Sequence, residues 1–426
     1  MSKLNDINFI HSLDKSDMHH LVVHLPEQIY LGYMDFEKMN PEFSNHFIPP
    51  PHYSSLMEGA DQTTLSAFFS HIIICGMGGS AISADIARAM FEYLIPIYIV
   101  KDYNIPDFYI DRINSHESME NPLIIIISYS GNTEEAIECY QQALEITHYV
   151  VVITSGGKME ETLTGNARPP LPENNESVVG SGNLEFSGSK GHLIKVPSGL
   201  PPRAAIGYLF FSLLRVLEYY RIVPDHSKEV NYLIANLMQK AGSLCYKTET
   251  MMNLAKSSAE AIFPKIPIIY SSNPLLSPVA YKWKCQINEN AKMPAFHNSF
   301  PELCHNEIEA FESEMYTKNL IPIFLRSFYE QKEYTEYIKK FQSLLQRKKI
   351  DYLEFFGETR MFDTDSTESI LSQQDEKIGE NDQLLEVFTL IYLGDIISFY
   401  LGILNGVDPT EIKNIDYIKR KDNGVE

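Results

Sequence analysis

The sequence LIIIISYSGNTEE, from Leu123 to Glu135, joins an apolar run to the start of an acidic helix. The run opens with one leucine and four isoleucines, and such side chains suit a strand that is buried on both faces. A strand-to-helix junction brings backbone N–H groups, hydroxyls and the positive end of a helix dipole to one place. We therefore predict an anion site here, with phosphate as the expected anion. Its residues are Ser128, Ser130, Gly131 and Thr133.

A second turn of the same kind lies earlier in the chain, in HIIICGMGGSAISADIARAM from His71 to Met90. The pattern predicts a strand over Ile72 to Cys75, a tight turn over Gly76 to Gly79 and a helix from Ser80 onward. Glycines in such a turn permit a close backbone approach that a Cβ would block.

Further apolar runs alternate with helix-like segments in this half of the chain. Strands are predicted at Ile95 to Val100 and Tyr149 to Thr154, a helix over Glu134 to Glu145, and a return to ordered structure at His192 to Val196. This alternation is typical of a parallel α/β sheet, in which ligands bind at the carboxyl ends of the strands. Both glycine and hydroxyl turns fall at those ends.

The second half repeats the α/β pattern without a clear sequence repeat. A helix-like stretch from Lys228 to Ser257 leads to the strand and turn of IPIIYSSNP at Ile266 to Pro274, and a helix is expected over residues 279–296. Short strands at Ile321 to Leu325 and Tyr352 to Phe355 flank an amphipathic helix from about Tyr334 to Arg347. Leu384 to Gly406 is expected to be a buried helix, which Gly394 and Asp395 interrupt too early for a membrane span.

These segments predict a chain of two α/β domains. We expect a helical N-terminal cap at residues 1–70 packed on the first domain, a first domain at 71–225 and a second at 226–426 with the C-terminal helices. Residues from about 165 to 191 are rich in Asn, Ser, Gly and Pro and are expected to form an exposed insertion. Residues 358–381 are polar and are expected to form a loop.

The composition narrows the class of partner. A net charge of -21 argues against nucleic acid or an anionic membrane surface, because both need a basic footprint. The N-terminus MSKLNDINFI has no signal-peptide core. The 5 cysteines form no CxxC pair, which favours a reducing cytoplasm over a disulfide framework.

Several motifs occur in the same order as in a known family. GMGGS at Gly76 to Ser80 and SYSGNTEE at Ser128 to Glu135 resemble the signature turns of a sugar isomerase (SIS) domain. With the motifs that follow them, they resemble the bifunctional phosphoglucose/phosphomannose isomerase family over nearly the whole chain beyond residue 70. The chain departs from that pattern in its insertion, its extended N-terminus and Cys304, where asparagine is more usual. The further motifs are VKDY at Val100, PPRAA at Pro201, NENAK at Asn288, PELCHNEI at Pro301 and DPTEIKNIDYIKR at Asp408.

The resemblance implies an α/β fold of two SIS-type, doubly wound parallel-sheet domains flanked by helices. It also implies a homodimer with active sites shared across the interface, and no cofactor. The implied reaction is the reversible isomerisation of glucose 6-phosphate or mannose 6-phosphate with fructose 6-phosphate. That reaction needs ring opening, proton transfer between C1 and C2 and a stabilised cis-enediol(ate), hence a base, an acid and a nearby cation.

The resemblance also assigns residues to these roles. Glu289 in NENAK matches the base, and His305 matches the ring-opening histidine that the neighbouring subunit supplies. Lys419, the first residue of a KRK run, matches a lysine that assists at the ring oxygen. Arg203 matches the cation beside the enediolate; at a helix start a cation gains nothing from the dipole, which by itself indicates a ligand or a carboxylate partner. Without the resemblance, each could equally be a solvated charge, a structural histidine or an ion pair.

The phosphate is predicted to bind Ser80, Ser128, Ser130 and Thr133, with the Gly79 backbone lining the reacting end of the sugar. Helix N-capping by Ser80 or Thr133 is the structural alternative. No metal cluster is evident, since His19, His20 and His24 lack supporting ligands, which separates this reading from zinc-dependent phosphomannose isomerases. Two other functions stay open: a phosphoglucose isomerase with little mannose activity, and a non-catalytic sugar-phosphate-binding protein, which would need no base.

Overall fold

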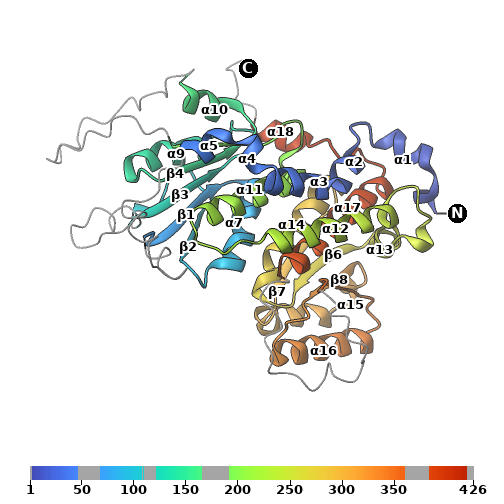
Figure 1. Ribbon diagram of the computed structural model, residues 1–426. Helices are drawn as coiled ribbons and strands as arrows, with labels where there is room; N and C mark the ends of the chain where they lie inside the picture. Colours follow the sequence, from blue (N-terminus) through green and yellow to red (C-terminus); the bar gives the residue numbers. More distant parts are fainter. Residues whose placement is uncertain are drawn as a thin grey trace, which may run out of the picture. The chain divides into compact units, whose positions relative to one another are not determined.

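The computed structural model describes residues 2–46, 68–107, 109, 121–165, 191–359 and 383–419. They form two compact units, each with one parallel sheet (Figure 1). The first unit is Glu27–Asp225, and the second unit joins Met1–Pro26 to His226–Glu426. The N-terminal segment is thus shared between the units. Most of the expected insertion, 166–190, and of the expected polar loop, 360–381, lies outside the described residues, as do 47–67 of the expected cap.

The sheet of the first unit contains five strands in the order β2-β1-β3-β4-β5, all parallel. Every residue of β1, β3 and β4 is buried, as their unbroken apolar runs predict for strands covered on both faces. The strands are β1 (His71–Gly76), β2 (Ile97–Val100), β3 (Pro122–Ile127), β4 (Val150–Thr154) and β5 (His192–Lys195).

Helices cover both faces of this sheet. Ile73 and Ile124 point to the face where Ala136 and Tyr140 of α9 (Glu134–Ile146) pack, together with α10 (Gly157–Thr164). Because strand side chains alternate, their neighbours point to the opposite face. That face is covered by α7 (Gly78–Phe91) and α11 (Ile206–Tyr219) (Figure 1). The helices α4 (Phe36–Met39) and α5 (Pro41–His46) complete the described part of this unit, after α3 (Leu25–Ile29) at its N-terminal boundary.

The strand order places a switch point between β1 and β3. The chain runs from β1 to β2 on one side, then returns to β3 on the other side of β1. In open parallel sheets the crevice at the carboxyl ends of two such strands is where ligands bind. Both turns singled out in the sequence begin at this place.

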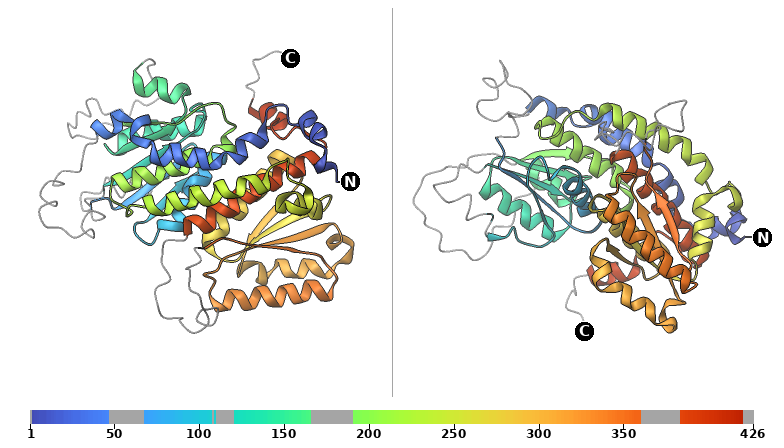
Figure 2. Two further views of the ribbon diagram at one scale, coloured as in Figure 1. Left: turned by 45° about the vertical axis from the view of Figure 1, so that its right-hand side comes forward. Right: turned by 90° about the horizontal axis from the view of Figure 1, so that it is seen from below.

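The second unit has a four-stranded parallel sheet in the order β7-β6-β8-β9. Ile338 and Phe341 of α16 (Lys332–Arg347) pack on one face against Tyr270 and Phe324. On the other side lie α14 (Ser277–Gln286) and α17 (Gln383–Leu404), and the left view of Figure 2 shows α17, in red, running above the strands. The strands are β6 (Ile266–Ser271), β7 (Phe296–Ser299), β8 (Leu320–Arg326) and β9 (Leu353–Phe356). The other helices are α1 (Ile7–Leu13), α2 (Met18–Val23), α12 (Ser227–Leu244), α13 (Leu254–Ile262), α15 (Glu314–Thr317) and α18 (Lys413–Lys419).

Two expectations for this unit were wrong in detail. The stretch from Lys228 to Ser257 is not one helix, because the backbone turns extended at Cys245 and Asn253 caps a new helix, α13. The helix expected through residue 296 ends in a π-helical turn, Ile287–Ala291, because Lys292 takes a left-handed conformation with φ 54°. Strand β7 follows, which the sequence pattern did not predict.

Helix α17 is long and apolar enough to cross a membrane, with a mean hydropathy of 1.9. However, 89% of its most apolar 18-residue segment is buried inside the structure, as in the core helix of a globular domain. Its burial matches the prediction for Leu384 to Gly406.

Candidate functional site

Gly79 and Arg203 meet at the start of α7. Gly79 is the second residue of this helix, and a Cβ at Gly79 would lie 3.0 Å from both the Cα and the N of Arg203. Arg203 belongs to the short 3₁₀ turn Pro202–Ala204 that precedes α11, and it is 5% exposed. The glycine therefore lets the segment that carries a buried guanidinium lie directly on the first strand-to-helix turn.

Ser80 and the turn after β3 are joined by a hydrogen bond. The N–H of Tyr129 donates to Oγ of Ser80 at 3.1 Å. The contact follows from strand register, since Gly76 at the end of β1 pairs with Ile127 at the end of β3. Ser80 is the third residue of α7 and is not its N-cap, so the capping alternative does not account for it.

Ser128 and Thr133 also meet. Oγ of Ser128 donates to Oγ1 of Thr133 at 3.2 Å, and Ser128 is 1% exposed. Thr133 is the N-cap residue of α9, yet its side chain makes no capping hydrogen bond. Ser130 is exposed, and its Oγ accepts from the N–H of Asn132 at 3.3 Å. Capping therefore does not explain this group of hydroxyls.

Tyr129 fixes the turn to its surroundings, a role that the sequence analysis missed. Its hydroxyl donates to the carbonyl of Pro197 at 2.8 Å and accepts from the N–H of Leu200 at 3.1 Å. Its carbonyl accepts from both N–H and Oγ of Ser155, at 2.9 and 2.6 Å. Burial raises the pKa of Tyr129. Tyr129 thus links the β3 turn to the loop that leads to Arg203.

Glycines lock the turns after β3 and β4 together. Gly131 has φ +64°, and a Cβ there would lie 1.8 Å from the carbonyl oxygen of Gly156. Gly157 has φ +72°, and its Cβ would lie 2.4 Å from the carbonyl oxygen of Ser130. A larger residue at either position would force the turns apart.

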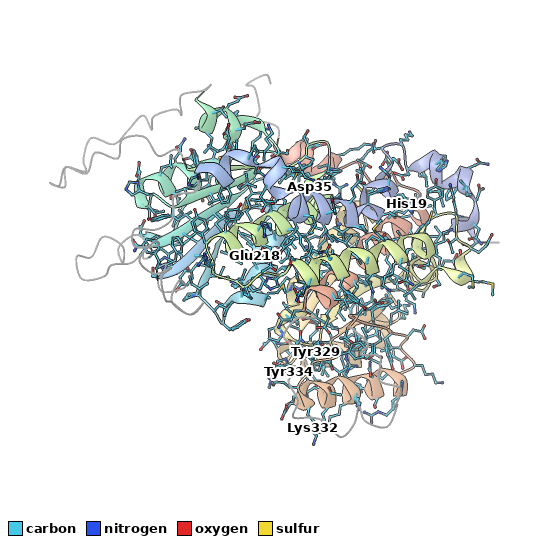
Figure 3. The ribbon with its side chains drawn as sticks, in the orientation of Figure 1. His19, Asp35, Glu218, Tyr329, Lys332 and Tyr334 are labelled. Atoms are coloured by element: carbon cyan, nitrogen blue, oxygen red, sulfur yellow. The ribbon has the colours of Figure 1, made fainter. Side chains whose placement is uncertain are left out.

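The corresponding turn of the second unit is closed by the chain's own carboxylate. After β8, Oγ of Ser327 and the N–H of Phe328 both donate to the carboxylate of Glu386, each at 2.9 Å. Tyr329, labelled in Figure 3, donates its N–H to Oγ of Ser327 at 3.0 Å. A Cβ at Gly357 would lie 2.1 Å from Cγ of Glu386, so the glycine leaves the room that this buried carboxylate occupies. The Glu386 carboxylate therefore accepts the hydrogen bonds that this turn offers.

The remaining predicted residues lie on three separate elements of the second unit. Glu289 is half-buried on the π-helical turn Ile287–Ala291. His305 is exposed at the end of the 3₁₀ turn Glu302–His305. Lys419 is exposed and is the last residue of α18.

Glu307 anchors the loop that carries His305. Its carboxylate accepts from the hydroxyl of Tyr270 at 2.7 Å and from Nδ2 of Asn298 at 2.6 Å. These partners lie on β6 and β7, so the loop is tied to two strands of the sheet. The sequence offered a signal for Glu307, since it lies within PELCHNEI.

The two units supply different chemistry. The first unit places hydroxyls, backbone amides and a buried arginine around one switch point, and these hydrogen-bond donors and this cation are the groups that bind anions. The second unit carries a carboxylate and an imidazole on well-anchored segments, which are groups that transfer protons.

Comparison with known proteins identifies the family of the chain. Residues 251–421 match the family model described as the bacterial phospho-glucose isomerase C-terminal SIS domain. The bifunctional phosphoglucose/phosphomannose isomerase of Caldicellulosiruptor bescii is 33% identical over 361 residues, covering 82% of this chain and 88% of that protein. The protein of the same description from Thermoplasma acidophilum is 30% identical over 359 residues, covering 83% and 90%.

The solved structures agree on the fold. The tagatose-6-phosphate ketose/aldose isomerase of Escherichia coli superimposes with a TM-score of 0.58 at 13% identity, covering 92% of this chain and 95% of that one. At this identity the likeness concerns the α/β SIS fold alone. The relatives carry the assignment further: this chain belongs to the bifunctional phosphoglucose/phosphomannose isomerase family of sugar-phosphate isomerases.

Proposed function

We propose that this protein interconverts glucose 6-phosphate and mannose 6-phosphate with fructose 6-phosphate, in the cytoplasm and without an added metal. The observation that carries the proposal is the turn cluster of the first unit, where Ser80, Ser128 and Thr133 gather beside the Arg203 segment. The names of the relatives supply the class of substrate.

The phosphate is assigned to the first unit. A sugar phosphate carries nearly two negative charges at neutral pH, and hydroxyls with helix-terminal amides can hold it without a lysine. The contrast with the second unit supports this assignment: there the Ser327 hydroxyl and the Phe328 N–H donate to the carboxylate of Glu386, whereas in the first unit the Ser128 hydroxyl and the Tyr129 N–H donate to neutral hydroxyls. One substrate site per chain is the expected stoichiometry.

Proton transfer is assigned to Glu289. In this mechanism its carboxylate takes the proton from C2 of the open-chain aldose and returns it to C1, while a hydroxyl proton moves between O1 and O2. Arg203 stabilises the negative charge of the enediolate, since a guanidinium stays charged throughout the cycle. Rotation about C2–C3 at the enediol stage presents either face of C2 to the base, so one carboxylate serves both epimers.

Ring opening is assigned to His305 of a neighbouring subunit, with Lys419 assisting at the ring oxygen. His305 is exposed on the single chain, which suits a group that serves a second copy, and Lys419 is exposed as well. A homodimer with shared sites is therefore part of the proposal.

The test compares turnover with binding. The parent protein, incubated with fructose 6-phosphate, should form aldose phosphate, and Glu289→Gln should lower kcat by about 100-fold or more while substrate binding is kept. Glu260→Gln, which changes an exposed carboxylate on α13, is the matched control and should keep the parent's activity. A parent protein that binds fructose 6-phosphate but never converts it would identify a sugar-phosphate sensor and refute the enzyme.

A further inference from the structure

Helix α17 carries a polar stripe within an otherwise apolar helix. Its mid-section reads LGDIISFYLG, from Leu393 to Gly402, and it is buried almost throughout. A buried carboxylate is costly unless it is paired and hydrogen-bonded. Asp395 is only 4% exposed, so its carboxylate requires partners that offset the cost of burial.

Two partners of the Asp395 carboxylate come from α14. Nζ of Lys282 lies 3.0 Å from Oδ1 of Asp395, and Nε2 of Gln286 donates to the same oxygen at 2.7 Å. Both partners are 1% exposed. The carboxylate thus fixes the last turn of α14, directly before the π-helical turn that carries Glu289.

The next turn of α17 contacts Asn290, the residue that follows Glu289. Nδ2 of Asn290 donates to Oγ of Ser398 at 2.9 Å, and this hydroxyl donates to the carbonyl of Asp395 at 2.7 Å. Asn290 and Ser398 are both fully buried. Directly after the end of α17, Nδ2 of Asn405 donates to the carbonyl of Ala291 at 2.9 Å.

Two glycines let the helices approach this closely. A Cβ at Gly394 would lie 2.2 Å from Nε1 of Trp283, and a Cβ at Gly402 would lie 2.6 Å from the carbonyl oxygen of Asn290. Positions 394, 398 and 402 are four residues apart and 395 is three before 398, so these four positions share one face of α17, and Asn405 directly follows the last residue of the helix. Gly402 and Ser398 of that face lie directly against Asn290 of the π-helical turn.

We infer that Asp395 and Ser398 are positioning residues, which hold the π-helical turn so that Glu289 meets the substrate in the geometry that proton transfer requires. The inference rests on the role proposed for Glu289. π-helical turns are rare, occur mostly as single turns and are frequent at functional sites, and here the contacts from α17 flank the turn on both sides of Glu289. Displacement of a catalytic group by about 1 Å can cost on the order of 100-fold in rate.

The test is Ser398→Ala, which removes the acceptor of Asn290 with little change of volume. Thr389→Val is the matched control: Thr389 is a buried hydroxyl residue on the same helix, and it accepts from the N–H of Glu358. Nine residues separate the two positions, which places them on opposite sides of α17. Ser398→Ala should lower kcat about tenfold with KM within threefold, and Thr389→Val should keep kcat within twofold.

Asn290→Ala and Asp395→Asn should give the same loss of kcat at constant KM, and thermal unfolding would show which variants are folded. When Ser398→Ala is added to Glu289→Gln, kcat should fall by less than a further twofold, because the effect of Ser398 acts through Glu289. A kcat for Ser398→Ala within twofold of the parent, or equal losses in Ser398→Ala and Thr389→Val, would overturn the positioning role. Full activity of Glu289→Gln alone would instead refute the proposed base.

Discussion

The backbones of Gly79 and Arg203 touch: a Cβ on the glycine would stand 3.0 Å from Cα and N of the arginine. A methyl group here meets backbone atoms, so it cannot be relieved by a side-chain rotation. The segment that holds the guanidinium would have to move.

Gly79→Ala should therefore lower kcat/KM on the order of 100-fold, because the cation proposed to stabilise the enediolate would be displaced. Gly78→Ala is a poor control, since φ at Gly78 is +51° and strains any side chain. Gly242→Ala is suitable, because a Cβ there meets nothing within 4 Å. Equal activity of Gly79→Ala and Gly242→Ala in a steady-state assay would show that this contact has no part in the reaction.

Ser128→Ala should act mainly on binding. The hydroxyl is proposed to hold the phosphate, remote from the reacting carbons, so KM should rise about tenfold with kcat nearly unchanged. Ser83→Ala, which removes another buried hydroxyl from the same unit, should leave both parameters near the parent's values. Lost turnover at unchanged affinity would show that Ser128 has a different role.

The apolar runs of β1, β3 and β4 could be predicted from sequence, because burial on both faces leaves a continuous signal. β7 could not, because its residues FHNS are half-buried or exposed at the edge of the sheet and carry no such pattern. The end of the π-helical turn was missed as well, since nothing local marks Lys292 for a left-handed conformation.

The site shows the same limit. Hydroxyls and glycines at the turns were visible in the sequence, but the hydrogen bond from Tyr129 to Ser80 depends on the register of two strands about 50 residues apart. Asp395 was visible only as an interruption of an apolar helix. Its link to Lys282 and Gln286 depends on helix packing, which sequence periodicity does not encode.

A mixing experiment tests the proposed shared site. His305→Ala and Glu289→Gln proteins should each be nearly inactive, and an equal mixture that exchanges subunits should regain about a quarter of the parent's activity. Half of the dimers would then be mixed, and each would carry one intact site. His148→Ala, an exposed histidine of the first unit, is the control for the histidine change. Mixed dimers verified by mass but inactive would contradict sharing.

His19, labelled in Figure 3, should make the fold sensitive to acid. Its ring lies among Tyr246 and Phe399, with centroids 4.7 and 5.1 Å away, and burial lowers its pKa to about 3. Between that value and its ordinary 6.5 the unfolded chain binds more protons than the folded one, so stability falls as pH drops.

The loss assigned to His19 at pH 5 is about 2 kcal/mol in the free energy of unfolding. His19→Phe should flatten the pH dependence measured by denaturant titration between pH 7 and about 5, whereas His148→Gln should not. An unchanged slope in His19→Phe would place the acid sensitivity elsewhere.

The most direct test of the central claim, that one carboxylate serves both epimers, is the product distribution from fructose 6-phosphate in the parent and in Glu289→Gln. We predict that the parent forms both glucose 6-phosphate and mannose 6-phosphate, and that Glu289→Gln lowers both rates by the same factor, on the order of 100-fold or more. Formation of glucose 6-phosphate alone, or a rate of mannose 6-phosphate formation that survives the substitution, would contradict it.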